Sequence, residues 1–109
     1  MKMFRLEKFT RGWIVGDFLP SIIRSRHMEV GIKQYKKGDT ESKHLHKKAE
    51  EITIVVNGAF RMAGKRLKQG DIVLVPKGET ADFECLSDGV TVVVKVPSVK
   101  GDKYPVRQA

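Results

Sequence analysis

The sequence has few residues that could form disulfide bonds or anchor the chain in a membrane. Cys85 is the only cysteine among 109 residues, so an internal disulfide is excluded and a reducing compartment is expected. The only apolar run near the basic start of the chain is Trp13-Ile14-Val15. Because this run is far too short for a signal-peptide core or a membrane span, we expect a cytoplasmic protein with no membrane partner.

Aromatic residues are scarce, at 7%, and they are not interleaved with basic residues in a single patch. The formal net charge of +8 comes from Lys and Arg side chains scattered along the chain. A nucleic-acid partner is therefore not expected, although phosphate binding would suit a charge of this sign. Two interpretations stay open: a solvated surface that keeps the protein soluble, or side chains that attract an anionic small molecule.

No stretch of the sequence shows helical periodicity long enough to predict a helix. The pattern is instead one of short apolar segments separated by turn residues. A chain of this length forms one domain. Turns are predicted at Ala63-Gly64 and Ser87-Asp88-Gly89, and a tight turn or a strand end at Asn57-Gly58. Strands are predicted over residues 28–35, 44–46, 51–56, 72–75, 83–86 and 90–96. This spacing is typical of an all-β barrel or sandwich.

The predicted strand 51–56 is largely apolar on both faces. Its faces are formed by alternate residues, Glu51, Thr53 and Val55 on one and Ile52, Ile54 and Val56 on the other. Only one face can line the core, and an exposed aliphatic stripe is an aggregation hazard. We therefore expect a second copy to cover the stripe Ile52/Ile54/Val56 in a homodimer.

Two of the three histidines, His44 and His46, stand at alternate positions shortly before this segment. On a strand, alternate side chains point to the same face. Glu51 can bring a carboxylate to that face if its strand pairs with the first one. Two imidazoles and one carboxylate form a metal-binding set with open positions, and such ligands suit divalent Fe, Mn, Ni or Zn.

This stretch resembles the first motif of the cupin superfamily, in which a glycine, an HXH pair, a glutamate and a second glycine follow one another at fixed spacing. The matching residues are Gly38, His44, His46, Glu51 and Gly58. The family pattern also tolerates Glu50 as the carboxylate, but only Glu51 keeps the six-residue gap before Gly58. The second cupin motif is matched by Gly70, Pro76 and Gly78, whereas Ala81 and Cys85 replace its histidine and asparagine.

The resemblance implies a double-stranded β-helix, that is, a cupin or jelly-roll barrel of two antiparallel sheets, over residues 28–96. Residues 1–27 are expected to add an N-terminal arm and edge strands, and residues 97–109 a C-terminal tail along the surface. Trp13, in the arm, either packs against the rim of the core or stacks on a ligand.

Two functions are compatible with this resemblance. In the first, His44, His46 and Glu51 hold a divalent metal, and a small polar or anionic metabolite is bound or converted, as in cupin dioxygenases, isomerases and decarboxylases. In the second, a non-catalytic module binds a sugar or carboxylate without a metal. Ala81, in the place of the motif histidine, favours the second function. The fold alone does not decide between the two, because fold does not fix function.

Strand parity extends the candidate site beyond the metal ligands. Ala81, Phe83 and Cys85 should share the inward face of their strand, so Phe83 and Cys85 are candidate pocket residues together with Thr53. Asp82 becomes a ligand only if the strand slips by one residue or carries a bulge. The alternative for Cys85 is a small buried thiol with a packing role.

Overall fold

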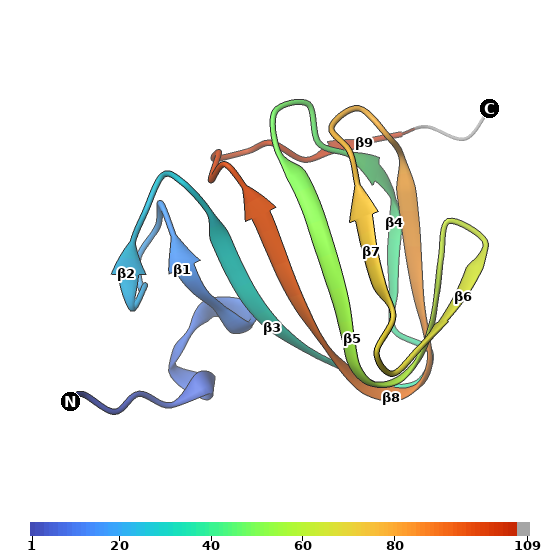
Figure 1. The fold of residues 1–109 in the computed structure, drawn as a ribbon, viewed down its shortest axis with the longest axis horizontal. Coiled ribbons are helices and arrows are strands. Elements are labelled where there is room, and N and C mark those ends of the chain that lie inside the picture. Colours follow the sequence, from blue (N-terminus) through green and yellow to red (C-terminus); the bar gives the residue numbers. More distant parts are fainter. Residues whose placement is uncertain (107–109) are drawn as a thin grey trace.

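The computed structural model describes residues 1–106, and strands dominate it (Figure 1). Two short 3-10 segments come first, η1 (Leu6–Lys8) and η2 (Thr10–Gly12). The strands follow in the order β1 (Trp13–Gly16), β2 (Ile23–Arg24), β3 (Glu29–Tyr35), β4 (Thr40–Leu45), β5 (Glu50–Met62), β6 (Lys65–Lys68), β7 (Ile72–Val75), β8 (Ala81–Val96) and β9 (Tyr104–Pro105). Within residues 1–106, no helix is long and apolar enough to cross a membrane.

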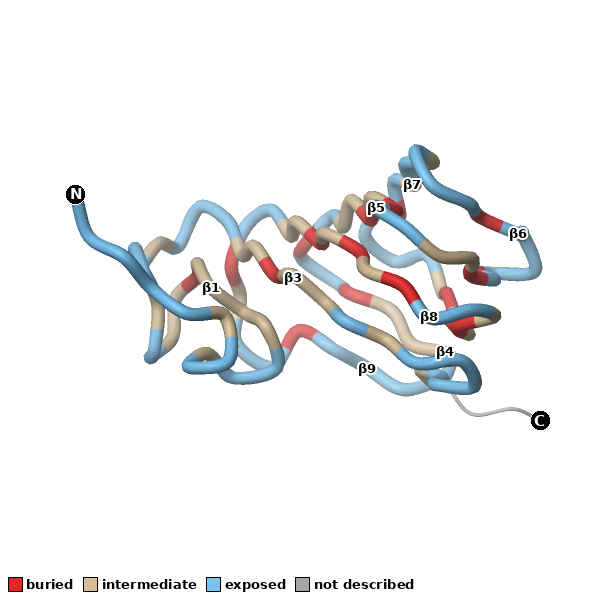
Figure 2. Tube along the Cα trace, turned by 90° about the horizontal axis from the view of Figure 1, so that it is seen from below, coloured by how far each residue is buried: buried red, intermediate tan, exposed pale blue. Residues whose placement is uncertain are grey.

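The nine strands of the described residues hydrogen-bond into one sheet. Along one path their order is β2-β1-β3-β8-β4-β9, and β5 joins this path at β8 while pairing also with β6 and β7. All pairs are antiparallel except β1 with β2. The all-β prediction is confirmed. Instead of two separate sheets, however, residues 1–106 form one folded sheet that is not closed into a barrel, with β4 and β9 lying behind β5 and β7 (Figures 1 and 2).

The sheet folds over because β5 and β8 are long and bend together. The turn or strand end predicted at Asn57-Gly58 and the turn predicted at Ser87-Asp88-Gly89 are wrong: both segments lie inside strands, at shifts in the β5–β8 register. There the two backbones nearly touch, since a Cβ placed on Gly58 would stand 2.6 Å from the Cα of Gly89. Glycine at both positions permits this approach, so the two segments form a shared bend in place of two turns.

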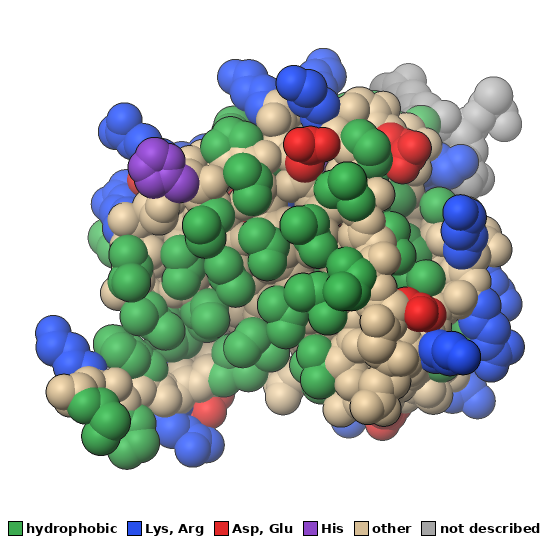
Figure 3. All heavy atoms as spheres, viewed as in Figure 1, with side chains coloured by type: hydrophobic (Ala, Val, Ile, Leu, Met, Phe, Trp, Pro, Cys, Tyr) green, Lys and Arg blue, Asp and Glu red, His purple; other side chains and the backbone are tan. Residues whose placement is uncertain are grey.

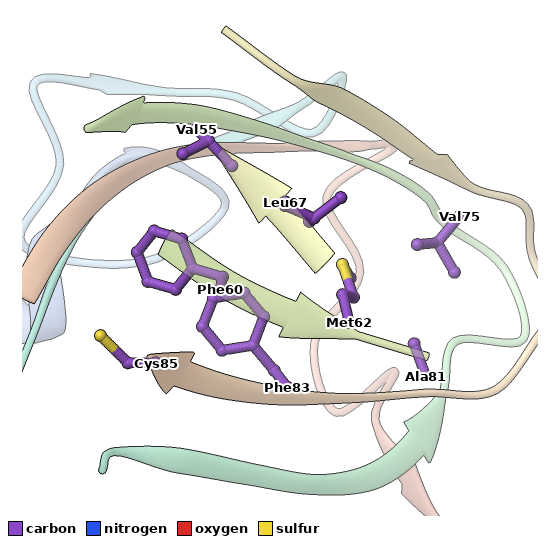
Figure 4. Packing of buried hydrophobic residues seen from close by; sticks show 8 residues of the cluster. All are labelled: Val55, Phe60, Met62, Leu67, Val75, Ala81, Phe83 and Cys85. Atoms are coloured by element: carbon purple, nitrogen blue, oxygen red, sulfur yellow. The ribbon is translucent and has the colours of Figure 1, made fainter. Parts of the chain in front are cut away.

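The fold of the sheet creates two layers, one with β5 and β7 and one with β4 and β9, and the core lies between them. Its largest member, Phe60, is fully buried and stacks on Phe83 with ring centroids 5.0 Å apart. The cluster is completed by smaller apolar residues from β5 to β8: Val55, Met62, Leu67, Val75, Ala81 and Cys85 (Figure 4). These residues alternate with exposed or half-buried ones along their strands, as period-two patterning requires (Figure 2).

The C-terminal segment is better anchored than the predicted surface tail. Ser98 and Asp102 are buried, and β9 pairs with β4 opposite His44 and Leu45. The predicted tail ran to residue 109, and its last three residues lie outside the described part of the chain. The segment closes one edge of the region where the two histidines lie.

Candidate functional site

A cavity of about 210 Å³ lies between the layers, against the inner faces of β3, β5 and β8. Inner positions on these strands alternate with outer ones, and register pairs Lys33 with Thr91 and Glu51 with Lys95 on adjacent strands. Their side chains therefore share the inner face and line the cavity. Charged residues on an inward face are costly to bury without partners, which marks this region as a candidate site.

Trp13 forms one wall of the cavity, where two lysines flank its indole. The Nζ atoms of Lys33 and Lys95 lie 4.8 Å and 5.1 Å from the ring centroid, within the range of cation–π attraction. The half-buried ring packs over Gly31 of the neighbouring strand and also lines the cavity, so its position is compatible with both roles predicted for Trp13.

Lys33, which lines the cavity, is held in place by a backbone contact. Its ammonium donates a hydrogen bond of 2.6 Å to the backbone oxygen of Arg11. Burial lowers the pKa of Lys33, and the nearby charges of Arg11 and Lys95 lower it further, against the opposing effect of Glu41. An anion placed here would relieve the repulsion among these cations.

Glu41 and Tyr35 form a polar pair on the other side of the cavity. The Tyr35 hydroxyl donates to Glu41 Oε2 at 3.3 Å, and the Tyr35 ring packs on Phe83 with centroids 4.9 Å apart. Burial raises the pKa of Tyr35, and the neighbouring Glu41 carboxylate raises it further. Tyr35 is therefore a neutral hydrogen-bond donor over the whole physiological pH range.

His44 and His46 come from the end of β4 and the turn after it. Their ring centroids lie 5.2 Å apart, and His44 lines the cavity. The Nδ1 atom of His44 is 2.9 Å from the backbone oxygen of Ser42, so with the proton on Nδ1 the Nε2 lone pair is free to bind. His46 is only 4% exposed, and its buried Nε2 has no hydrogen-bond partner among the described residues.

Burial keeps His46 neutral. It lowers the pKa of His46 to about 4, and the positive charges of Lys95 and His44 act in the same direction. A neutral imidazole with an unpartnered nitrogen can accept a hydrogen bond or bind a metal ion.

Glu51 lines the cavity, whereas its rival Glu50 is exposed. Burial raises the pKa of Glu51, and the charges of Lys95 and His44 partly offset that effect. Among residues 1–106, however, no three His, Cys, Asp or Glu side chains are arranged so that they could hold a metal ion. The set His44, His46 and Glu51 thus stays a prediction, supported by the unpartnered nitrogen of His46.

The candidate pocket residues on β5 and β8 separate into two groups. Phe83 and Thr53 line the cavity, as does Ala81, which stands opposite His44 on the neighbouring strand. Cys85 lies instead in the apolar cluster, with its thiol donating to the Ser87 backbone oxygen at 3.1 Å. Burial raises the pKa of this thiol, so Cys85 is a packing residue and its assignment to the pocket needs correction.

Asp102, like the two lysines beside Trp13 and the Tyr35–Glu41 pair, is a residue of the site region that sequence reasoning missed. Its carboxylate accepts hydrogen bonds from the backbone amides of Lys47, Lys48 and Ala49, at 2.9 to 3.2 Å. Burial opposes ionisation, but these amides outweigh it and lower the pKa of Asp102. Asp102 thereby fixes the turn that directly follows His46. A lone aspartate 53 to 55 residues away from its partners carries no sequence signal.

Solved structures with the same architecture are numerous. An RmlC-like cupin from Shewanella frigidimarina is 23% identical, with a TM-score of 0.64 over 69% of this chain and 70% of that one. An uncharacterised conserved protein with a double-stranded β-helix domain from Klebsiella pneumoniae is 18% identical, with a TM-score of 0.73 over 98% and 93% of the two chains.

Oxalate decarboxylase from Bacillus subtilis, a protein with Mn(II) centres, is 17% identical, with a TM-score of 0.65 over 75% of this chain and 25% of that one. No protein-family model and no curated protein sequence matches the chain. At these identities the likeness establishes the fold, and the double-stranded β-helix prediction is confirmed.

Proposed function

We propose that this chain, a small domain of the cupin fold, binds a small anionic metabolite in the cavity beside Trp13. The observation that carries the proposal is the placement of Lys33 and Lys95 on the only tryptophan of the chain, at the wall of the cavity. A carboxylate or phosphate group could accept hydrogen bonds from both ammonium groups, while the indole offers a flat apolar surface to the rest of the ligand.

The charge balance of the cavity supports an anion. Four basic side chains line it, Arg11, Lys33, Lys95 and Lys103, against the three acidic ones, Glu41, Glu51 and Asp82. Glu41 accepts a hydrogen bond from the Tyr35 hydroxyl, and burial raises the pKa of Glu51 just as it lowers that of Lys33. The cavity therefore presents more positive than negative charge to a ligand.

The size of the cavity limits the ligand. Its volume of about 210 Å³ corresponds to about seven water molecules at roughly 30 Å³ each. This suits a molecule no larger than one sugar unit or a short dicarboxylate. Tyr35, His44 and Thr53 supply polar contacts for hydroxyl groups of such a ligand.

The test uses the fluorescence of Trp13, which has no other tryptophan to obscure it. The protein is titrated with galacturonate, oxalate and glucose 6-phosphate, and with neutral galactose as the matched control. We expect a saturable change with at least one anion and none with galactose. Lys95→Met should weaken that binding by roughly tenfold or more, whereas Lys65→Met, at an exposed position on β6, should not. A response to galactose equal to that of the anions, or no response to any of the four, would contradict the proposal.

A divalent metal is a second candidate ligand, and the unpartnered Nε2 of His46 favours it. His44 and His46 would hold the ion, with Glu51 as the carboxylate that completes the predicted set. A bound metal would supply Lewis-acid polarisation of a ligand's oxygen atoms. The likeness to a Mn(II) oxalate decarboxylase supports this candidate without identifying the metal.

Metal content provides the test of this second candidate. Untagged protein purified without chelator is analysed by plasma mass spectrometry beside the His44→Ala/His46→Ala double variant. Near-stoichiometric metal in the wild type and its loss in the variant are expected. A wild type that stays empty after titration with Fe(II), Mn(II), Ni(II) and Zn(II) would rule the metal out and leave the anion site as the function.

A further inference from the structure

The outer face of the sheet, on the side away from the cavity, carries two continuous rows of aliphatic side chains. The register between strands places their members directly opposite one another. The long row crosses six strands through Ile23, Val15, Val30, Val94, Ile52 and Leu74. The short row crosses four strands through Ile32, Val92, Ile54 and Ile72.

In the single chain both ends of the long row and the β7 end of the short row are open to solvent, and the other members are half-buried. Ile72 and Leu74 on β7 are 67% and 56% exposed, and Ile23 on β2 is 66% exposed. Figure 3 shows hydrophobic side chains gathered across this face, with Lys, Arg, Asp and Glu mainly towards its edges. We call the two rows together the aliphatic face.

The aliphatic face approaches the extent of a stable interface. Six strands at a spacing of about 4.8 Å span about 24 Å, and the outer positions from Val90 to Val96 on β8 span about 20 Å. The flat footprint is thus roughly 500 Å² before the relief of the side chains is counted. Each partner in a standard stable complex contributes about 800 Å², whereas monomers rarely expose apolar patches larger than a few hundred Å².

We propose that the aliphatic face is the interface of a two-fold symmetric dimer of this chain, in which the sheets of two copies pack face to face. β-Branched side chains on a sheet interdigitate well with a second sheet of the same kind, about 10 Å away. A two-fold interface brings the same patch of both copies together, so a self-complementary aliphatic surface suffices.

The distribution of charge favours this face over the rest of the surface as the site of self-association. Copies of a chain with a net charge of +8 repel each other, and self-association is cheapest where no like charges meet. No side chain of the two rows is charged. A lipid surface is the less suitable occupant, because the rows hold only Val, Ile and Leu and lack the aromatic and basic side chains that anchor proteins at membrane interfaces.

The dimer is independent of the proposed ligand site, because inner and outer residues alternate along the same strands. On β5, Glu51 and Thr53 line the cavity while Ile52 and Ile54 lie on the aliphatic face. A failure of one proposal therefore leaves the other standing.

Sedimentation velocity over a micromolar concentration series tests the dimer. We expect the wild type to dimerise, and Ile72→Lys to weaken the association by roughly tenfold or more, since it places a charge in the interface. The matched control is Gln69→Lys, which adds the same charge at an exposed position on the turn before β7. Because Ile72 is exposed in the single chain, the variant should keep the circular dichroism spectrum of the wild type.

Several outcomes would overturn the proposal. One is a wild type that stays monomeric throughout the series. Another is a dimer that persists in the Ile72→Lys/Leu74→Lys double variant, which would place the interface elsewhere. A third is a monomer that sediments with vesicles of phosphatidylcholine and phosphatidylserine and is released by Ile72→Lys, which would make the face a lipid-binding surface.

Discussion

The indole of Trp13 lies directly over the backbone of Gly31 on the neighbouring strand. A Cβ at position 31 would stand 2.7 Å from Cε3 of the ring and 2.9 Å from Cζ3, closer than packed carbon atoms approach. The two residues are partners in the β1–β3 register. The absence of a side chain at Gly31 thus allows the ring to settle on β3, between Lys33 and Lys95.

We predict that Gly31→Ala displaces the Trp13 ring and weakens binding of the anionic ligand. Because the added methyl group overlaps the ring, the indole must shift, at a cost of about 1–3 kcal/mol in the free energy of unfolding. The emission of Trp13 should move to longer wavelength as the ring becomes more exposed. Gly64→Ala, in an open hairpin turn with no atom within 4 Å of the added Cβ, is the control and should leave the emission unchanged. Unchanged emission in Gly31→Ala would contradict the predicted displacement.

Asp102 is predicted to stabilise the turn after His46 through its hydrogen bonds to three backbone amides. Asp102→Asn replaces one acceptor oxygen by a donor facing those amides, so the free energy of unfolding at neutral pH should fall by about 2 kcal/mol or more. Urea unfolding measures the change. Asp71→Asn is the control: within residues 1–106 the Asp71 side chain accepts one hydrogen bond, from the Lys68 amide in an exposed turn, so this variant should cost less than about 1 kcal/mol.

The pH dependence of that difference follows from the lowered pKa of Asp102. A carboxyl group whose pKa is lower in the folded state stabilises the protein above its unfolded pKa and loses this effect as pH falls through the folded pKa. The difference in the free energy of unfolding between wild type and Asp102→Asn should therefore be at its full size at pH 7 and decrease only below about pH 4. A gap that is independent of pH down to acid unfolding would mean that the charge of Asp102 does not matter.

Strand parity explains which parts of the site could be predicted. The period of two predicted Ala81 and Phe83 on one face, and both are buried. The choice of Glu51 over Glu50 came from the family spacing instead, and Glu51 lines the cavity while Glu50 is exposed. Parity cannot tell which of two faces is the inner one, however. On β3 the apolar pair Val30 and Ile32 belongs to the outer face, while Lys33 faces the cavity.

Long-range contacts set the second limit. Asn57-Gly58 has the composition of a hairpin turn, and only its pairing with the segment around Gly89 converts it into a bend inside a continuous strand. The contact of Asp102 with the turn after His46 likewise depends on how the folded sheet brings the C-terminal segment back to β4. Local sequence patterns therefore could predict neither the bend in β5 and β8 nor the contact of Asp102.

His46 should make the metal-free protein less stable in mild acid. Its pKa falls from an ordinary value of 6.5 to about 4 on folding, so between these values the unfolded chain binds more protons than the folded one. Stability contributed by neutral His46 is thus present above about pH 6.5 and is lost as pH falls towards 4, by about 2–3 kcal/mol. Urea unfolding of chelator-treated protein at several pH values measures this slope.

Two variants separate His46 from the other titrating groups. His46→Gln should flatten the slope between pH 6.5 and 4, whatever its effect on absolute stability. His27→Gln, at an exposed position before β3, should leave the slope as in the wild type. If both variants show the same slope, His46 is not the group responsible for the loss of stability in mild acid.

Ala81→His tests whether the histidine pair is a metal site that lacks one ligand. Ala81 is the register partner of His44 and lines the same cavity, so a side chain added there points towards His44 and Glu51. The volume of about 210 Å³ leaves room for an imidazole. If His44 and His46 bind a metal, a third imidazole should raise the affinity for Zn(II) by roughly tenfold or more, measured by isothermal titration calorimetry. Glu84→His is the matched control, because it adds an imidazole on the same strand at a half-exposed position paired with Arg61. An equal gain in both variants, or no gain in Ala81→His, would contradict a metal site at the histidine pair and leave the lysine-flanked face of Trp13 as the basis of ligand binding.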